Sequence, residues 1–289
     1  MWAYPAMAME KKDNVRISIL HTNDMHSRID AFPGDDPKYP GLGGMTHLAG
    51  EVKRIRSEEK NVLLLDAGDI FQGTPYFNLF GGEVEFKLMS EMGYAASTLG
   101  NHDFDNGVEG LIEMLPYANF PFVNVNYDLS KSPLKEHVQD YIIKEIDGMR
   151  VGIFGVGIEL AGLVDKKNYG DIIYKDPIEE SKKVAKHLKE TERCDLIICL
   201  SHLGYSYREK KVSDQDLALE NQYVDLIIGG HTHTMLKKPQ KIRSKYQKNC
   251  LVNQVGWAAI RLGKIDFSLH KWTNESQIEA RNLIVKKLV

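Results

Sequence analysis

The stretch Leu99-Gly100-Asn101-His102-Asp103-Phe104-Asp105 places an amide, an imidazole and two carboxylates within five consecutive positions. It follows the apolar run 95–98, which is typical of a buried strand, and Gly100 would let the chain turn where that strand ends. Open α/β sheets carry their active sites on such loops, at the carboxyl ends of strands. The stretch therefore predicts a functional loop, and an ordinary polar turn is the alternative.

Three side chains of this loop receive separate interpretations. We interpret Asn101 as a metal ligand and His102 as the group that faces the substrate. Asp105 would hold the ring of His102 in its working tautomer.

Length and composition indicate a folded protein with a sizeable core. The 289 residues are 43% hydrophobic and 27% charged, which suits one large domain or two small ones. The net charge of −3 and a pI of about 6.4 give no electrostatic footprint for nucleic acid. No apolar run reaches the roughly 18 residues of a membrane span, and three cysteines argue against a disulfide framework.

The N-terminal segment 1–14 is treated apart from the domain 15–289. It is either a disordered N-terminus or the remnant of an export signal, because Ala6-Met7-Ala8 has the form of a signal-peptidase site. A charged region and most of an apolar region are missing from it. The first alternative allows a cytoplasmic protein, and the second predicts a periplasmic or exported one.

Strands and helices alternate through most of the chain. Such alternation implies a largely parallel sheet, and continuous apolar runs such as 61–66 indicate strands buried on both faces. The expected strands are 16–22, 61–66, 95–98, 122–126, 196–200 and 224–228, and the expected helices are 49–60, 83–92, 108–117, 177–191 and 214–221.

Other segments predict antiparallel structure. Asp147-Gly148 suits a type I′ turn between strands 138–146 and 150–156. The runs 251–255, 259–269 and 277–288 indicate a β-rich, antiparallel C-terminal quarter. The basic segment 237–248 carries six Lys or Arg and no acid. We interpret it as a solvated connection, with a phosphate-attracting rim as the alternative.

Five predicted strand ends carry polar side chains that could converge in space. The carboxylate and imidazole of Asp24 and His26 lie two residues apart, which in an extended backbone points both the same way. Carboxylate, imidazole and amide ligands suit Zn²⁺, Mn²⁺, Fe²⁺, Co²⁺ or Mg²⁺, and their number favours two ions that share a carboxylate. The five sets are Asp24 with His26; Asp69; Asn101 with His102 and Asp105; His202; and His231 with His233.

The order of these motifs resembles a known family. It is similar to the five sequence blocks of the calcineurin-like metallophosphoesterases, and the similarity extends from residue 16 to the C-terminus. Within that superfamily it resembles the 5′-nucleotidase group, which includes UDP-sugar hydrolases and 2′,3′-cyclic-nucleotide phosphodiesterases. The blocks are Asp24-x-His26, Gly68-Asp69, Gly100-Asn101-His102-Asp103, Ser201-His202 and Gly230-His231-Thr232-His233.

The resemblance implies an α/β (α+β) fold, a four-layer αββα sandwich of two mixed sheets flanked by helices. It implies hydrolysis of phosphate esters, most closely of the 5′-nucleotidase phosphomonoesterase type, through a hydroxide that bridges two divalent ions. Asn101 and His102 would bind the phosphate, and Asp105 would hold His102. The implied ligands are Asp24, His26, Asp69 and His233 for one ion, and Asp69, Asn101, His202 and His231 for the other.

One departure from the family concerns the substrate. Full-length 5′-nucleotidases carry a C-terminal domain that supplies nucleoside-binding aromatics, and this chain stops where the catalytic domain is expected to end. Two alternatives therefore stay open beside a nucleotidase. The first is a 2′,3′-cyclic-nucleotide phosphodiesterase or UDP-sugar hydrolase, and the second is a metal-binding module that is active only with a separately encoded substrate-binding domain.

Overall fold

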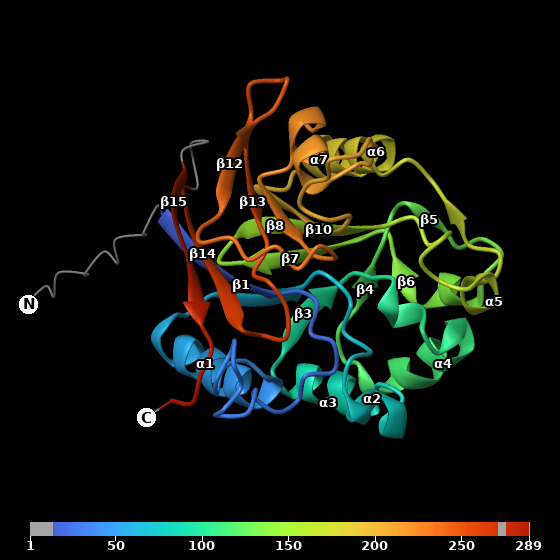
Figure 1. Cartoon of the computed structure of the whole chain (residues 1–289). Helices are drawn as coiled ribbons and strands as arrows, with labels where there is room; N and C mark the ends of the chain where they lie inside the picture. The colour runs from blue at the N-terminus through green and yellow to red at the C-terminus, as the bar shows by residue number, and fades with distance from the viewer. Residues whose placement is uncertain (1–13, 271–275, 289) are drawn as a thin grey trace, which may run out of the picture.

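Two β-sheets lie face to face between two layers of helices in the computed structural model, which describes residues 14–270 and 276–288 (Figure 1). The first sheet has seven strands and the second has six. This is the four-layer αββα sandwich that the resemblance implies, so that expectation is confirmed. The segment around Ala6-Met7-Ala8 lies outside the described residues, and Asn14 is the first residue of strand β1.

The first sheet has a parallel centre, to which two antiparallel strands are added at one side. Its order is β15-β14-β1-β2-β3-β4-β6. Strands β1, β2, β3, β4 and β6 run parallel, and β14 pairs antiparallel with both β1 and β15. The strands are β1 (Asn14–Thr22), β2 (Val62–Asp66), β3 (Tyr94–Ser97), β4 (Phe122–Val123), β6 (Val138–Gln139), β14 (Arg261–His270) and β15 (Ser276–Ile284).

The second sheet also has a parallel centre, with one antiparallel strand at each edge. Its order is β12-β13-β11-β10-β8-β7. The strands are β7 (Tyr141–Ile146), β8 (Met149–Gly157), β10 (Leu196–His202), β11 (Leu226–Gly229), β12 (Gln240–Arg243) and β13 (Asn249–Asn253), and a separate pair joins β5 (Tyr127–Asp128) to β9 (Ile173–Tyr174).

Helices cover the outer face of each sheet, as Figure 1 shows. On the first sheet lie α1 (Met45–Glu58), α2 (Pro75–Phe80), α3 (Glu83–Glu91) and α4 (Gly107–Met114); on the second lie α6 (Pro177–Glu190) and α7 (Asp214–Glu220). The shorter helices are α5 (Lys166–Tyr169), η1 (His102–Phe104), η2 (Leu115–Tyr117) and η3 (Pro133–Glu136). None of the helices in the described ranges is long and apolar enough to cross a bilayer.

Three apolar layers hold this arrangement together. Side chains such as Ile19 and Ile198 fill the space between the sheets. Phe86 packs in the layer under the first set of helices, and Leu188 and Cys199 pack under the second. Strands in both sheets are therefore buried on two faces, which explains their continuous apolar runs. The three cysteines are buried and free, as expected for small core residues.

The antiparallel expectations are partly confirmed. Asp147 and Gly148 have φ of 48° and 85°, as a type I′ turn requires, and they join β7 to β8. Residues 138–139, expected in the same hairpin, instead form β6 in the first sheet. The expected antiparallel strand 251–255 is confirmed on one side only, because β13 pairs antiparallel with β12 and parallel with β11.

The basic segment 237–248 is not only a connection, because it contains strand β12. Exposed Lys241 and Arg243 alternate with half-buried Gln240 and Ile242 along it. Positive charges on an edge strand discourage pairing with another chain, so these residues have a structural explanation.

A cluster of charges with a buried centre, Lys264 and Asp266, links β1 to β14. Lys264 Nζ donates to Asp266 Oδ2 at 2.6 Å and to Glu59 Oε1 at 3.1 Å. Ser18 Oγ and Arg16 Nη2 also donate to Asp266, at 2.6 and 3.0 Å. Burial raises the pKa of Asp266, but the hydrogen bonds from Lys264 and Ser18 outweigh it and hold that pKa below its usual value.

We expect Asp266→Asn to lower the free energy of unfolding by about 3 kcal/mol at pH 7, because it leaves the Lys264 ammonium buried beside a neutral amide. The pKa of Asp266 is lower in the folded protein than in the unfolded chain, where it is about 4. Asp266 therefore stabilises the native state above about pH 4, and this stabilisation is lost as the pH falls. The difference between wild type and variant should therefore shrink below about pH 4 in urea unfolding. Glu279→Gln, at an exposed carboxylate 3.8 Å from Arg16, is the control and should be nearly neutral. Equal effects of the two substitutions would contradict the prediction.

Candidate metal centre

The five polar strand ends meet at one place between the two sheets. The loops after β1, β2 and β3 leave the first sheet, and those after β10 and β11 leave the second. The expectation that Asp24 and His26 lie in extended backbone is wrong, because their φ values are 52° and 49°. Asp69, His231 and His233 are also left-handed, with φ of 57°, 71° and 49°. Such conformations are unfavourable for non-glycine residues, and they cluster at functional sites.

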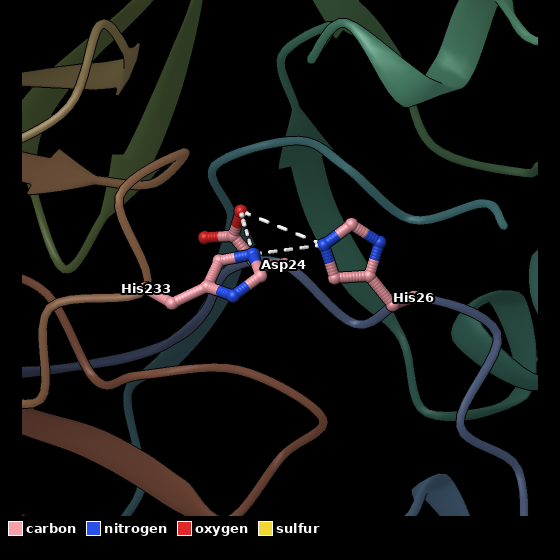
Figure 2. Close-up of side chains that lie close together, drawn as sticks. All are labelled: Asp24, His26 and His233. Carbon is pink, nitrogen blue, oxygen red and sulfur yellow. Dashed lines mark hydrogen bonds and ion pairs between the residues drawn. The ribbon is translucent and has the colours of Figure 1, made fainter. Parts of the chain in front are cut away.

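The first group of side chains comprises Asp24, His26 and His233 (Figure 2). Nε2 of His26 lies 2.9 Å from Nε2 of His233. Oδ1 of Asp24 lies 3.3 Å from Nε2 of His233 and 4.0 Å from Nε2 of His26. Two ring nitrogens and a carboxylate oxygen thus face one small volume.

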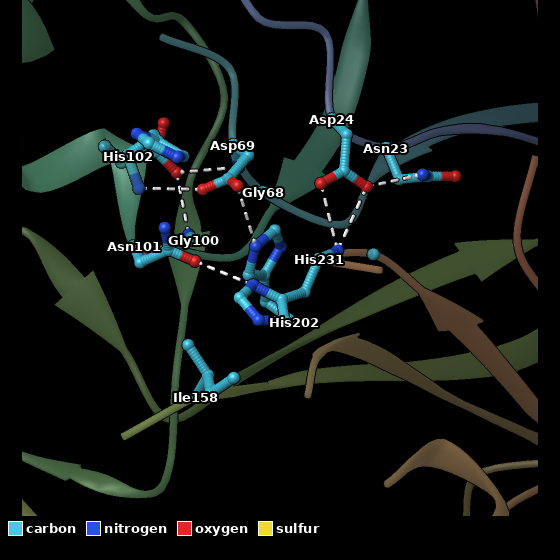
Figure 3. A network of polar contacts seen from close by, with 12 residues as sticks. Asn23, Asp24, Gly68, Asp69, Gly100, Asn101, His102, Ile158, His202 and His231 are labelled. Atoms are coloured by element: carbon cyan, nitrogen blue, oxygen red, sulfur yellow. Dashed lines mark hydrogen bonds and ion pairs between the residues drawn. The ribbon is translucent and has the colours of Figure 1, made fainter. Parts of the chain in front are cut away.

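The second group comprises Asp69, His202 and His231 (Figure 3). Asp69 Oδ2 lies 3.1 Å from Nε2 of His202. Nδ1 of His202 donates to the carbonyl of Ala67 at 2.6 Å, which leaves Nε2 for another partner. Asn101 joins this group, because its Oδ1 lies 2.8 Å from Nδ1 of His231.

His102 lies beside the two groups. Its Nδ1 donates to Asp105 Oδ2 at 2.9 Å. Its ring meets that of His26 edge to face, with centroids 5.3 Å apart. Its backbone N–H donates to Asp69 Oδ1 at 2.8 Å. The structure therefore brings together every side chain that the sequence placed in the site, and their individual roles remain proposals.

Asp103 fixes the loops after β2 and β3 to each other, a role that the sequence did not reveal. Its carboxylate accepts hydrogen bonds from the backbone N–H groups of Asp69, Ile70 and Gly100, at 3.1, 2.9 and 2.7 Å. Gly100 is required by close approach, because a Cβ there would lie 2.2 Å from Oδ1 of Asp69. Left-handed backbone is not what requires glycine at this position, since Gly100 is absent from the positive-φ residues of the described chain.

Asn23 is a second residue that the sequence did not single out. Its Nδ2 donates to Asp24 Oδ2 and to the carbonyl of Gly256, both at 2.6 Å. Asn23 thereby joins the loop after β1 to the loop before β14. A polar residue next to a candidate ligand was the only signal available in the sequence.

The electrostatics of the site follow from burial and from Asp69. Burial opposes ionisation of Asp69, but His202 and His26 hold its pKa below the usual range. Burial would lower the pKa of His202, and Asp69 instead raises it to about 10. Burial and His202 lower the pKa of His231 to about 4. The hydrogen bond to Asp105 raises the pKa of His102.

The residues of both groups fit divalent metal ions. Within each group the candidate ligand atoms all lie within 4.8 Å of one another. Imidazole nitrogens and carboxylate oxygens are ligands for Zn²⁺, Mn²⁺, Fe²⁺ or Co²⁺. The Nε2 atoms of His26 and His233 face each other at 2.9 Å, so a cation or a proton can lie between them. Because ligands must be deprotonated, binding near His202 would release a proton.

The αββα sandwich and these two groups define a candidate metal-dependent hydrolase. The sequence profile described as calcineurin-like phosphoesterase matches residues 17–235. The chain belongs to this family, as the sequence motifs predicted.

Individual relatives and structures agree with the family. A snake venom 5′-nucleotidase of Crotalus adamanteus is 36% identical over 229 residues, which cover 76% of this chain and 37% of that protein. The trifunctional nucleotide phosphoesterase YfkN of Bacillus subtilis is 30% identical over 282 residues, 86% of this chain and 18% of that protein. The crystal structure of a 5′-nucleotidase precursor from Thermus thermophilus matches with a TM-score of 0.83 and 30% identity, over 94% of this chain and 55% of that one. The chain thus spans about half or less of these proteins.

Proposed function

We propose that this chain catalyses the metal-dependent hydrolysis of phosphate monoesters, with nucleoside 5′-monophosphates as the substrate class. One observation carries the proposal: the carboxylate of Asp69 lies between the two groups, 3.1 Å from Nε2 of His202 and 3.9 Å from Nε2 of His26. A shared carboxylate suits a pair of ions that act on one phosphoryl group. The 5′-nucleotidase relatives support the substrate class.

The residues proposed to hold the two ions come from the first group, the second group and Asn101. When bound, two divalent ions would polarise the phosphoryl oxygens and lower the pKa of a coordinated water. The residues that would hold them are Asp24, His26, Asp69 and His233 for one ion, and Asp69, Asn101, His202 and His231 for the other.

His102 and Asn101 are the proposed phosphate-binding residues. Because Nδ1 of His102 is engaged by Asp105, Nε2 is the ring atom left to donate a hydrogen bond to a phosphoryl or leaving-group oxygen. The side chain of His102 is 37% exposed, so a substrate can reach it. Asp105 orients the ring and does not itself contact the substrate in this proposal.

A hydrolysis screen tests the proposal. The full chain, loaded with Mn²⁺ or Zn²⁺, would be offered AMP, an aryl phosphate, an aryl phosphodiester, a 2′,3′-cyclic nucleotide and UDP-glucose. We expect release of phosphate from AMP and the aryl phosphate, and loss of that activity with a chelator. Absence of hydrolysis of both monoesters by protein shown to contain metal would contradict the proposal.

The same site could act on a cyclic phosphodiester or a nucleotide sugar, and this is the second candidate. The relative named a trifunctional nucleotide phosphoesterase favours it, because that name gives the whole protein more than one function. In the screen, turnover of the cyclic nucleotide or UDP-glucose at least tenfold above AMP would select this alternative.

We also propose that the protein acts outside the cytoplasm. The venom origin of a relative and the motif Ala6-Met7-Ala8 support export. Immunodetection in fractionated source cells should find the protein in the periplasmic or extracellular fraction. Recovery with a cytoplasmic marker enzyme would contradict export without affecting the proposed chemistry.

A further inference from the structure

His233 differs from the other candidate ligands in how its ring is held. Ligating histidines are normally oriented by a hydrogen bond from the second ring nitrogen. Nδ1 of His202 donates to Ala67 and Nδ1 of His26 donates to Phe71, at 2.6 and 3.3 Å. Across residues 14–270 and 276–288, Nδ1 of His233 has no such acceptor. The His233 side chain is also 39% exposed, against 8% for His26.

Trp257 provides the contact that His233 otherwise lacks. The two rings are nearly parallel, with an interplanar angle of 7° and centroids 5.8 Å apart. An offset stack of this kind restricts rotation of the imidazole while leaving both nitrogens free. The indole also meets His26 at 6.4 Å in an edge arrangement. Trp257 thus contacts both histidines of the first group.

The indole is itself fixed by its neighbours. Phe32 and Tyr39 contact it with centroids 5.6 and 6.5 Å away, both close to perpendicular. A side chain packed on several sides can hold a partner in one orientation, which a freely rotating surface tryptophan could not do. Trp257 is half-buried, so it forms part of the wall of the site.

The loop that carries Trp257 is fastened to Asp24. Asn23 Nδ2 donates to the carbonyl of Gly256 at 2.6 Å, and the N–H of Ala258 donates to the carbonyl of Asp24 at 2.8 Å. Ala258 and Ala259 have φ of 55° and 52°, conformations that alanine adopts only when the surroundings impose them. The loop geometry is therefore set by the same segment that supplies the first group.

We propose that Trp257 is a positioning residue, which holds the His233 imidazole in the orientation needed to bind the ion of the first group. The inference rests on the proposed metal-binding function. It assigns the stack the role that a hydrogen-bonded carbonyl plays for His202 and His26. Trp257→Leu should therefore weaken one ion, not both, and Trp257→Phe should retain most of the affinity because it keeps a flat ring.

Mn²⁺ binding to metal-free full-length protein, measured by calorimetry, tests the proposal without an activity assay. We expect Trp257→Leu to weaken one of two sites by about 10–100-fold and to leave the other within threefold. In a His233→Ala background the same substitution should have no further effect, because Trp257 acts through His233. Tyr246→Leu, at an aromatic ring 52% exposed on the protein surface, is the matched control.

The outcomes separate this inference from the proposed function. Wild-type protein that binds no ion would overturn both. Wild-type protein with two ions and an unchanged Trp257→Leu variant would overturn the inference alone, as would an undiminished effect of that substitution in the His233→Ala background. If Trp257→Leu fails to fold, Trp257→Met replaces it with the same expectation, because it also removes the flat ring. An unchanged affinity in that variant, or a loss of both ions, would contradict a role confined to the first group.

Discussion

Replacing His102 by alanine is expected to lower kcat by about 10²–10⁴-fold while the protein keeps its metal ions. The side chain would stabilise charge on the phosphoryl or leaving-group oxygen and is not a proposed ligand. Its link to Asp69 runs through the backbone N–H, at 2.8 Å, which alanine retains. Steady-state kinetics on AMP and elemental analysis of the same sample measure the two effects.

Two further substitutions sharpen this prediction. His187→Ala removes a histidine on α6 that hydrogen-bonds Tyr141, away from both candidate metal groups, and should leave kcat unchanged. Asp105→Asn should cost less than His102→Ala, about 10-fold, because it disturbs only the orientation of the ring. An unchanged kcat for His102→Ala would remove His102 from the mechanism. Loss of metal together with activity would show that His102 supports the ions.

The sequence predicted the parallel parts of the fold better than its edges. Strands such as β10 and β11 are buried on both faces, so their apolar runs are visible without knowledge of the partner strand. Strand β12 was not predicted, because its Lys and Arg residues hide the usual apolar pattern of a strand. They suit the edge of a sheet, and only the pairing with β13 places β12 at an edge. The parallel pairing of β13 joins it to β11, more than twenty positions earlier in the chain, and no local pattern encodes it.

The same distinction applies to the site. Asp24, His202 and the other candidate ligands were predicted because each follows a recognisable strand, and parallel strands bring such ends together. The supports of the ligands were not predicted. The contacts of Asp103 with backbone N–H groups and of Trp257 with His233 depend on left-handed loops, whose φ values have no reliable signature in residues such as Asp69 or Ala258.

We expect the Asp69→Asn variant to bind neither metal ion stoichiometrically. Its kcat/KM should fall by at least about 10³-fold. The carboxylate lies between the two groups, and an amide carries no charge to offset two cations. The backbone should survive the substitution, because asparagine tolerates the left-handed conformation that Asp69 adopts at φ 57°. His26→Ala, by contrast, should mainly empty one site. Elemental analysis after gel filtration distinguishes the two patterns.

Asp214→Asn is the matched control for this substitution. Asp214 is also fully buried, and burial raises its pKa to about 8, whereas the pKa of Asp69 is held low, so asparagine changes less charge at position 214 than at position 69. The control should retain the metal content of the wild type. If Asp69→Asn still held both ions, the two groups would not share this carboxylate. If it lost only one, Asp69 would belong to a single site, and the two ions would not share the carboxylate on which the proposed arrangement depends.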